Sequence, residues 1–125
     1  MTMAMVTISS CSGSKKNENA GTAIAGPTLS ESAARGETVF NKSGCNSCHH
    51  STIDQVSKGL GPSLVSISAA YKTAGGQTAL VEFLGGNDKP IVNPEKYGIM
   101  KNIMNIIKRI PEKERSDLAD YIMSY

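Results

Sequence analysis

The sequence predicts one all-α domain, and three observations carry that prediction. Apolar residues recur at helical spacing in several segments, whereas no segment alternates apolar and polar residues as a half-buried strand does. The 125 residues suffice for one domain and are too few for two. Only 39% of the residues are hydrophobic, with no Trp and two Phe, which suggests that a bound group fills part of the interior; the small size of the chain is the alternative explanation.

The first 29 residues differ in composition from the rest of the chain. The letters "ISSC" end at Cys11 and resemble the lipobox of bacterial lipoproteins, in which the cysteine carries lipid. The basic start and long apolar run of a full signal peptide are missing, so an ordinary cysteine in a tail is the alternative. Residues 12–29 are small and polar, which is typical of a flexible tether. We predict a partial signal and tether over 1–29 and a folded domain over 30–125.

The folded domain is expected to open with a helix after Ser30. A serine at this place can cap a helix N-terminus, and Ala33, Gly36 and Phe40 follow at helical spacing. Glycine lowers helix propensity, so Gly36 needs a reason. Close approach by another helix would supply one, and simple tolerance of the glycine is the alternative.

Four further segments also favour helices. A Gly-Pro turn precedes the segment 63–73, and the segment 77–84 is followed by two glycines that suit a helix end. Residues 99–110 are apolar at helical spacing. The last segment, 111–125, starts with a proline that suits the first helical position and has acidic residues in its first turn. Its apolar stripe consists of Leu118, Tyr121, Ile122 and Tyr125.

The stretch "GCNSCHH" concentrates the reactive side chains of the chain. Cys45 and Cys48 are three apart and are followed by His49 and His50. A zinc site would have to borrow carboxylates, because no second cysteine pair is present. Disulfide exchange normally uses a Cys-x-x-Cys after a strand, and no strand is predicted. The remaining chemistry is covalent haem attachment, whose signature is Cys-x-x-Cys-His.

The spacing of this motif explains the chemistry of attachment. Residues i and i+3 lie on one side of a helical turn, so both thiols can bond to one edge of a haem. The residue after the second cysteine is then held beneath the ring, where an imidazole can reach the iron. His49 stands at that position, and His50 is rotated about 100° further around the turn. We therefore predict His49 as the proximal ligand and His50 as a residue of the surface or of the rim of the haem site.

The chain resembles the small bacterial monohaem cytochromes c of class I over residues 30–125. The resemblance rests on four motifs in the order that this family shows. They are Gly36 and Phe40; Cys45, Cys48 and His49; Gly61, Pro62, Ser63 and Leu64; and Leu118, Ala119, Asp120, Tyr121 and Ile122. The resemblance implies a cytochrome c fold, with four to five short helices around one haem c held by two thioethers.

The resemblance also implies roles for individual residues. The first and last helices of the family cross at the helix-one glycine, which implies a crossing at Gly36 with Phe40 and Tyr121 as packing partners. The family's proline carbonyl accepts a hydrogen bond from the proximal imidazole, which assigns that role to Pro62 beside His49. Such bonds fix the ring and raise its basicity.

The second axial ligand is expected to be a methionine, because the family uses His and Met. Met100 and Met104 both lie between the middle and last helices, where the family places its ligand. Met100 directly follows the loop "NPEKYGI", and a loop can approach the iron more freely than a residue one turn inside a helix. We predict Met100 as the ligand and Met104 as a core residue; Met104 as the ligand and an open site are the alternatives.

These predictions indicate a one-electron carrier rather than an enzyme, shuttling electrons between respiratory complexes or to a terminal oxidase. The alternative is a haem enzyme or sensor with a weak or open sixth site for peroxide, NO or CO. We expect the protein to be a monomer whose partners are other redox proteins. Its net charge of +2 gives no support to nucleic-acid binding. Covalent haem and the lipobox-like Cys11 indicate the periplasm or another site outside the cytoplasmic membrane, with membrane attachment through that cysteine.

Overall fold

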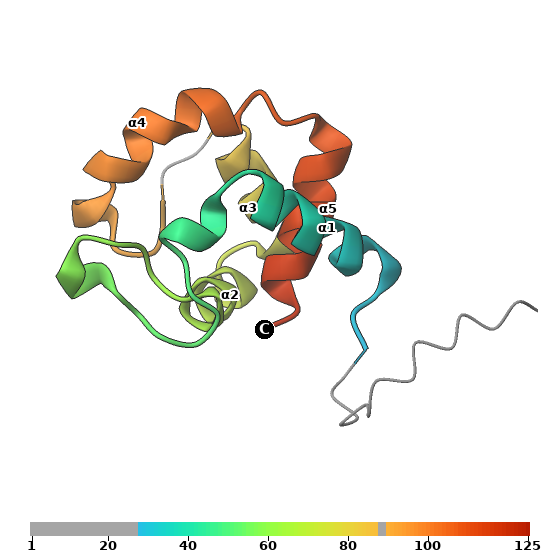
Figure 1. Ribbon diagram of the computed structural model, residues 1–125, viewed down its shortest axis with the longest axis horizontal. Coiled ribbons are helices and arrows are strands. Elements are labelled where there is room, and N and C mark those ends of the chain that lie inside the picture. Colours follow the sequence, from blue (N-terminus) through green and yellow to red (C-terminus); the bar gives the residue numbers. More distant parts are fainter. Residues whose placement is uncertain (1–27, 88–89) are drawn as a thin grey trace, which may run out of the picture.

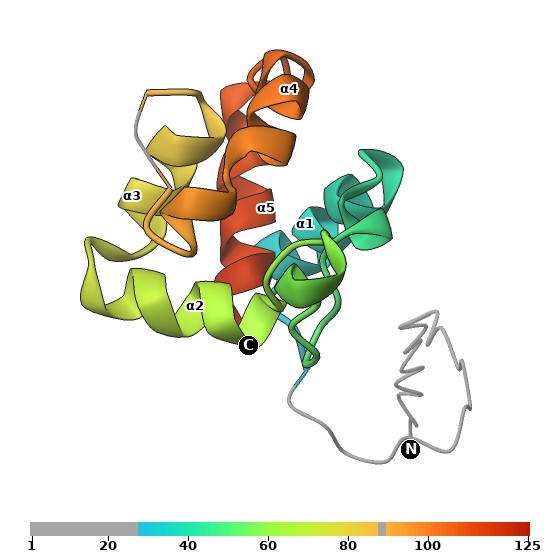
Figure 2. The same cartoon turned by 90° about the vertical axis from the view of Figure 1, so that its left-hand side faces the viewer.

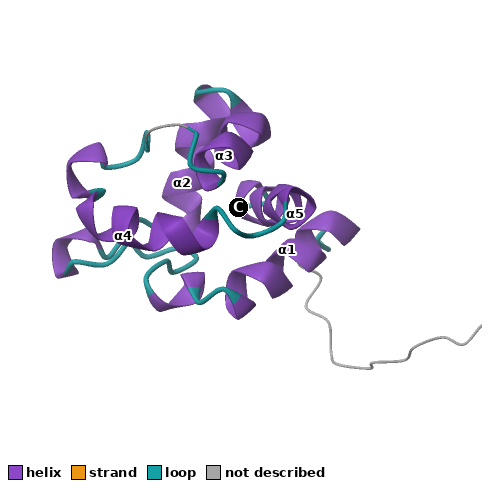
Figure 3. Ribbon diagram, turned by 90° about the horizontal axis from the view of Figure 1, so that it is seen from above, coloured by secondary structure: helices purple, strands orange, loops and turns teal. Residues whose placement is uncertain are grey.

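The computed structural model describes residues 28–87 and 90–125, and within these ranges the chain is all-helical (Figures 1 and 3). This confirms the predicted fold class. The α-helices are α1 (Glu31–Lys42), α2 (Leu64–Thr73), α3 (Gly76–Leu84), α4 (Gly98–Ile107) and α5 (Glu112–Met123). Three short 3-10 helices lie between them: η1 (Cys45–Ser47), η2 (Val56–Lys58) and η3 (Pro94–Lys96). No helix of the described ranges is long and apolar enough to cross a bilayer.

The N-terminal segment is outside this description. Residues 1–27 include Cys11 and most of the predicted tether, and they lie outside the described residues. Thr28, Leu29 and Ser30 are exposed and precede the first helix. The division of the chain into a tether and a domain at residue 30 therefore stays a prediction.

The helix ends follow the local signals in the sequence. Ser30 caps α1, because its side chain accepts a hydrogen bond from the Ala33 amide at 3.2 Å. Ser63 caps α2 in the same way through the Ser66 amide at 3.1 Å. The start of α5 differs by one residue from the prediction. Pro111 is extended (φ −53°, ψ 144°) and forms the N-cap, so its ring precedes the first helical turn rather than lying in it.

The core of the molecule is built on the crossing of α1 and α5. These two helices contact each other more extensively than any other pair in the described residues, and α5 also packs against α2 and α3 (Figures 1 and 2). Gly36 lies at the crossing. A Cβ atom there would overlap the Asp117 carbonyl and come within 2.8 Å of the Tyr121 Cβ. The predicted reason for Gly36, close approach by another helix, is confirmed.

Aromatic and aliphatic side chains complete this crossing. The rings of Phe40 and Tyr121 lie 5.4 Å apart between centroids and are tilted by 59°, as the resemblance implied. The rings of Tyr121 and Tyr125 also form a T-shaped pair, with their centroids 5.6 Å apart. Leu118 is fully buried, with Tyr121 and Ile122 buried beside it. The predicted apolar stripe of the last helix therefore faces the core.

An ion pair ties α1 to α5 beside the crossing. Arg35 donates to both carboxylate oxygens of Asp117, from Nε at 2.9 Å and from Nη2 at 3.1 Å. Lys113 Nζ lies 3.5 Å from the same carboxylate. The bidentate bond to Arg35 holds the pKa of Asp117 below its ordinary value. The charged carboxylate therefore stabilises the folded state more than the neutral acid does.

This ion pair predicts a pH dependence of stability. A carboxyl group whose pKa is lowered in the folded state stabilises that state at pH values above its ordinary pKa of about 3.9. This contribution is lost as the pH falls through the lowered pKa. Asp117→Asn should lower the melting temperature at pH 7, and the difference from wild type should shrink below about pH 3. Circular dichroism melts from pH 7 to pH 2 measure it. Glu31→Gln is the control, because Glu31 pairs with Arg35 but is 94% exposed. A difference that stays constant over this range would contradict the prediction.

Candidate functional site

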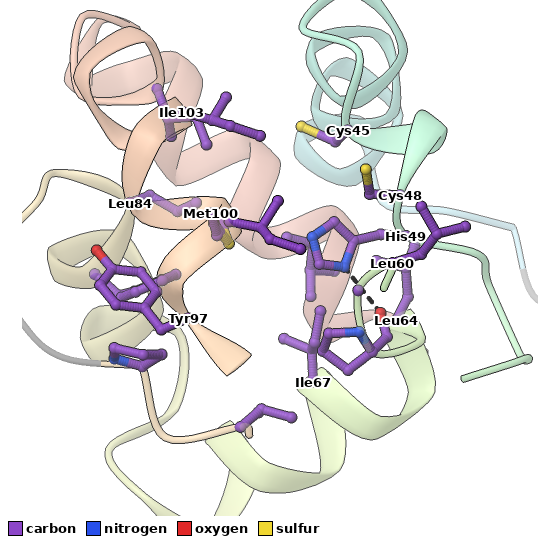
Figure 4. Close-up of a pocket in the computed structure, with 18 of the residues that line it drawn as sticks. Cys45, Cys48, His49, Leu60, Leu64, Ile67, Leu84, Tyr97, Met100 and Ile103 are labelled. Atoms are coloured by element: carbon purple, nitrogen blue, oxygen red, sulfur yellow. Dashed lines mark hydrogen bonds between the residues drawn. The ribbon is translucent and has the colours of Figure 1, made fainter. Parts of the chain in front are cut away.

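The Cys-x-x-Cys-His motif forms one tight turn after α1. Gly44 takes a left-handed conformation (φ 77°), and the 3-10 helix η1 begins at Cys45. The amides of Cys48 and His49 both point to the Cys45 carbonyl, at 3.2 and 3.0 Å. This turn brings the side chains of Cys45 and Cys48 to the same end of a cavity, where both thiols are free and half-buried (Figure 4). Cys45 begins this 3-10 helix and Cys48 is its C-cap, so the predicted helical turn holds Cys45, whereas Cys48 lies just after it.

His49 lines the cavity and has one nitrogen fixed by the backbone. Its Nδ1 lies 2.8 Å from the Pro62 carbonyl oxygen (Figure 4). A carbonyl only accepts, so Nδ1 carries the proton and Nε2 keeps its lone pair in the neutral ring. Burial lowers the pKa of His49, although the bond to Pro62 acts in the opposite direction. The neutral form, which can bind a metal ion, is therefore favoured. His50 is exposed and does not line the cavity.

Gly61 lies directly against the His49 ring. A Cβ atom on Gly61 would come within 2.5 Å of Nδ1 and 2.9 Å of Nε2. The Gly61 amide also donates to the Cys48 carbonyl at 2.9 Å, which ties the two segments together. The sequence predicts a turn at Gly61 but not this contact. The Gly-Pro pair indicates a turn. Only the tertiary structure shows that position 61 also has to be a glycine because the loop lies against the imidazole.

Met100 and Met104 occupy different environments. Met100 lines the cavity from the first turn of α4 and lies across it from His49 (Figure 4). Met104 is only 6% exposed, belongs to the apolar core and is not among the residues that line the cavity. The expectation that Met100 follows a loop was wrong in one respect. α4 starts at Gly98, and the Lys101 amide already bonds to the Tyr97 carbonyl at 2.9 Å.

The cavity wall is almost entirely apolar. α1, α2, α3 and α5 contribute one side of it, including the residues Phe40, Leu64, Ile67, Leu80, Phe83 and Leu118. α4 forms the opposite side, with Ile99, Ile103 and Ile106 exposed by 58%, 39% and 66%. Aliphatic side chains this exposed on a cavity wall fit a large apolar ligand that covers them. Two thiols, an imidazole and a thioether around such a space fit a covalently bound haem.

The other two chemistries weighed for this motif gain no support. Within residues 28–87 and 90–125, no three His, Cys, Asp or Glu side chains gather closely enough to hold a metal ion, Cys45, Cys48 and His49 included. Burial raises the pKa of the Cys45 thiol. A thiol that works by disulfide exchange needs the opposite shift, because its thiolate is the nucleophile.

Comparison with known proteins agrees with this geometry. The cytochrome c family model matches residues 33–125, which includes the cysteine motif, the Gly-Pro turn, Met100 and the last helix. No curated protein matches the sequence significantly. The predicted cytochrome c fold is therefore confirmed, and with it the expectation of haem-based electron transfer through a covalently bound c-type haem. The chain belongs to the cytochrome c family.

Proposed function

We propose that this cytochrome c is a one-electron carrier with a single haem, attached through Cys45 and Cys48 and ligated by His49 and Met100. One observation carries the proposal: these four side chains line the same apolar cavity, the thiols at one end and the imidazole and thioether on opposite sides (Figure 4). It moves electrons between redox proteins, such as respiratory complexes or a terminal oxidase. We expect it to work as a monomer.

When bound, the haem supplies the one-electron redox chemistry. The protein supplies the environment of the iron. Pro62 holds the His49 ring in one orientation and keeps its proton on Nδ1, so that Nε2 is the ligating nitrogen. Met100 would hold the iron from across the cavity, which would leave no place for a substrate to bind. The isoleucines of α4 would cover the haem on their side of the cavity and keep water from it.

Optical spectroscopy of the expressed full chain tests this function. A pyridine haemochrome should give the spectrum of haem attached by two thioethers, and acid-acetone should extract none of it. Replacing both cysteines of the motif, Cys45→Ser with Cys48→Ser, should make the haem extractable. Cys11→Ser is the matched control, because it makes the same substitution outside the motif, and it should keep the haem covalently bound.

Two results would count against the proposal. Haem that stays on the protein after both motif cysteines are replaced would reject attachment through thioethers. A high-spin spectrum of the oxidised wild type would instead favour an open sixth site, and hence an enzyme or a sensor of peroxide, NO or CO.

We further propose that the carrier works in the periplasm or elsewhere outside the cytoplasmic membrane, anchored by lipid on Cys11. Its support is the lipobox-like "ISSC" followed by a polar tether. In a host that processes lipoproteins, Cys11→Ser should move the product from the membrane fraction to the soluble fraction. Ser9→Ala, which keeps a small residue before the cysteine, is the control and should stay with the membranes. A Cys11→Ser product that remains membrane-bound would refute the anchor.

A further inference from the structure

Asp54 lies in the loop between His49 and Pro62, and its carboxylate closes that loop. Its Oδ1 accepts a hydrogen bond from the Ser63 amide at 2.6 Å, and its Oδ2 accepts one from the Ser66 hydroxyl at 2.9 Å. Both oxygens therefore hold the N-terminus of α2, where a negative charge is also favoured by the helix dipole. None of the four motifs in the sequence includes Asp54.

The Ser63 amide and the Pro62 carbonyl belong to the same peptide unit. Because the peptide is planar and trans, its N–H and C=O point in opposite directions. The N–H points to Asp54, and the C=O accepts from His49 Nδ1 at 2.8 Å. One peptide thus connects a carboxylate on one side to the imidazole on the other.

This connection can act on the ligating nitrogen of His49. Hydrogen bonds in a chain polarise one another, so a charged acceptor on the N–H makes the carbonyl a stronger acceptor. A stronger acceptor at Nδ1 raises the basicity of the other ring nitrogen. Ser63 is 1% exposed, so its backbone amide relies on Asp54 rather than on water. The bond from this amide also holds the pKa of Asp54 below its ordinary value, which keeps the carboxylate charged at neutral pH.

We propose that Asp54 is a positioning residue for the iron ligand His49, acting through the Pro62–Ser63 peptide. It holds the Pro62 carbonyl toward Nδ1 and strengthens Nε2 as a donor to ferric iron. The inference rests on the proposed function, because it requires His49 to ligate the haem. A more basic ligand stabilises the oxidised state, so Asp54 lowers the midpoint potential.

Two substitutions of Asp54 in the haem-loaded protein test this role. Asp54→Asn keeps an acceptor and removes the charge, and Asp54→Ala removes both. The midpoint potential should rise from wild type to Asp54→Asn and rise further in Asp54→Ala. In NMR spectra of the reduced protein, the proton on His49 Nδ1 should move upfield and exchange faster with water in the same order.

Asp120→Asn is the matched control, because it makes the same change of charge on α5, in a side chain that makes no bond to the Pro62–Ser63 peptide. Shifts in both Asp54 variants no larger than in this control would overturn the proposal. If Asp54→Ala fails to fold, Asp54→Asn alone decides by the same comparison. A wild type without a His-ligated haem would instead reject the proposed function, and this inference with it.

Discussion

Met100→Ala is expected to remove the weak red absorption band that ferric haem shows with a methionine ligand. Loss of the thioether leaves water or nothing in the second axial position, so the oxidised spectrum should shift toward high spin. Methionine raises the haem potential. The midpoint potential should therefore fall by roughly 100–300 mV, within the ~0.8 V that axial ligands span. Absorption spectra and a redox titration measure both effects.

Met104→Ala is the matched control for this result, since it makes the same substitution one helical turn further along α4. Met104 is buried in the core and does not line the cavity, so its loss leaves a void. We expect it to keep the red band and to lose about 2–5 kcal/mol of unfolding free energy. The reverse pattern, with the band lost only in Met104→Ala, would exchange the roles of the two residues.

The two methionines also show what the sequence could and could not predict about the site. Their spacing of four puts both on one side of a helix, so periodicity alone cannot separate them. The prediction of Met100 rests on its place after a loop, yet Met100 lies inside the first turn of α4. What separates them is depth: Met104 points into the packed core, whereas Met100 reaches the cavity.

The helices can be predicted from the sequence because the residues that indicate them lie close together in the chain. Ser30 and Ser63 cap the helices that the sequence predicts, and the apolar stripe of the last helix repeats at the helical period. The crossing at Gly36 can be predicted because glycine has a low helix propensity, and close approach by another helix is one of few reasons for a glycine inside a helix. Each of these features can be recognised within about ten residues of sequence.

Two of the contacts around His49 cannot be predicted in this way, although its bond to Pro62 can. Gly61 touches the imidazole, and Asp54 holds the peptide behind it, both through the path of an irregular loop. Irregular loops have no hydrophobic period, so nothing in the sequence says which of their residues will meet. The roles of Gly61 and Asp54 therefore emerge only from the structure, whereas His49 and its bond to Pro62 follow from the motifs.

Gly61→Ala is expected to disturb the predicted iron ligand His49, which lies across the cavity from Met100. The new Cβ would come within 2.5 Å of His49 Nδ1, so either the ring or the loop must move. A moved ring weakens the bond to Pro62 and tilts Nε2 away from the position that the cysteines fix for the haem. The oxidised protein should become partly high spin and lose about 1–3 kcal/mol of unfolding free energy.

Gly98→Ala separates this steric effect from the general effect of replacing a glycine. Gly98 begins α4, has no positive φ, and has open space where a Cβ would lie. Alanine there should leave the spectrum unchanged and stabilise the helix slightly, by up to about 1 kcal/mol. If Gly61→Ala gives the same spectrum and stability as Gly98→Ala, the added methyl group disturbs neither the imidazole nor its bond to the iron. In that case Pro62 and the two thioethers alone, and not the close approach of Gly61, fix the position of His49.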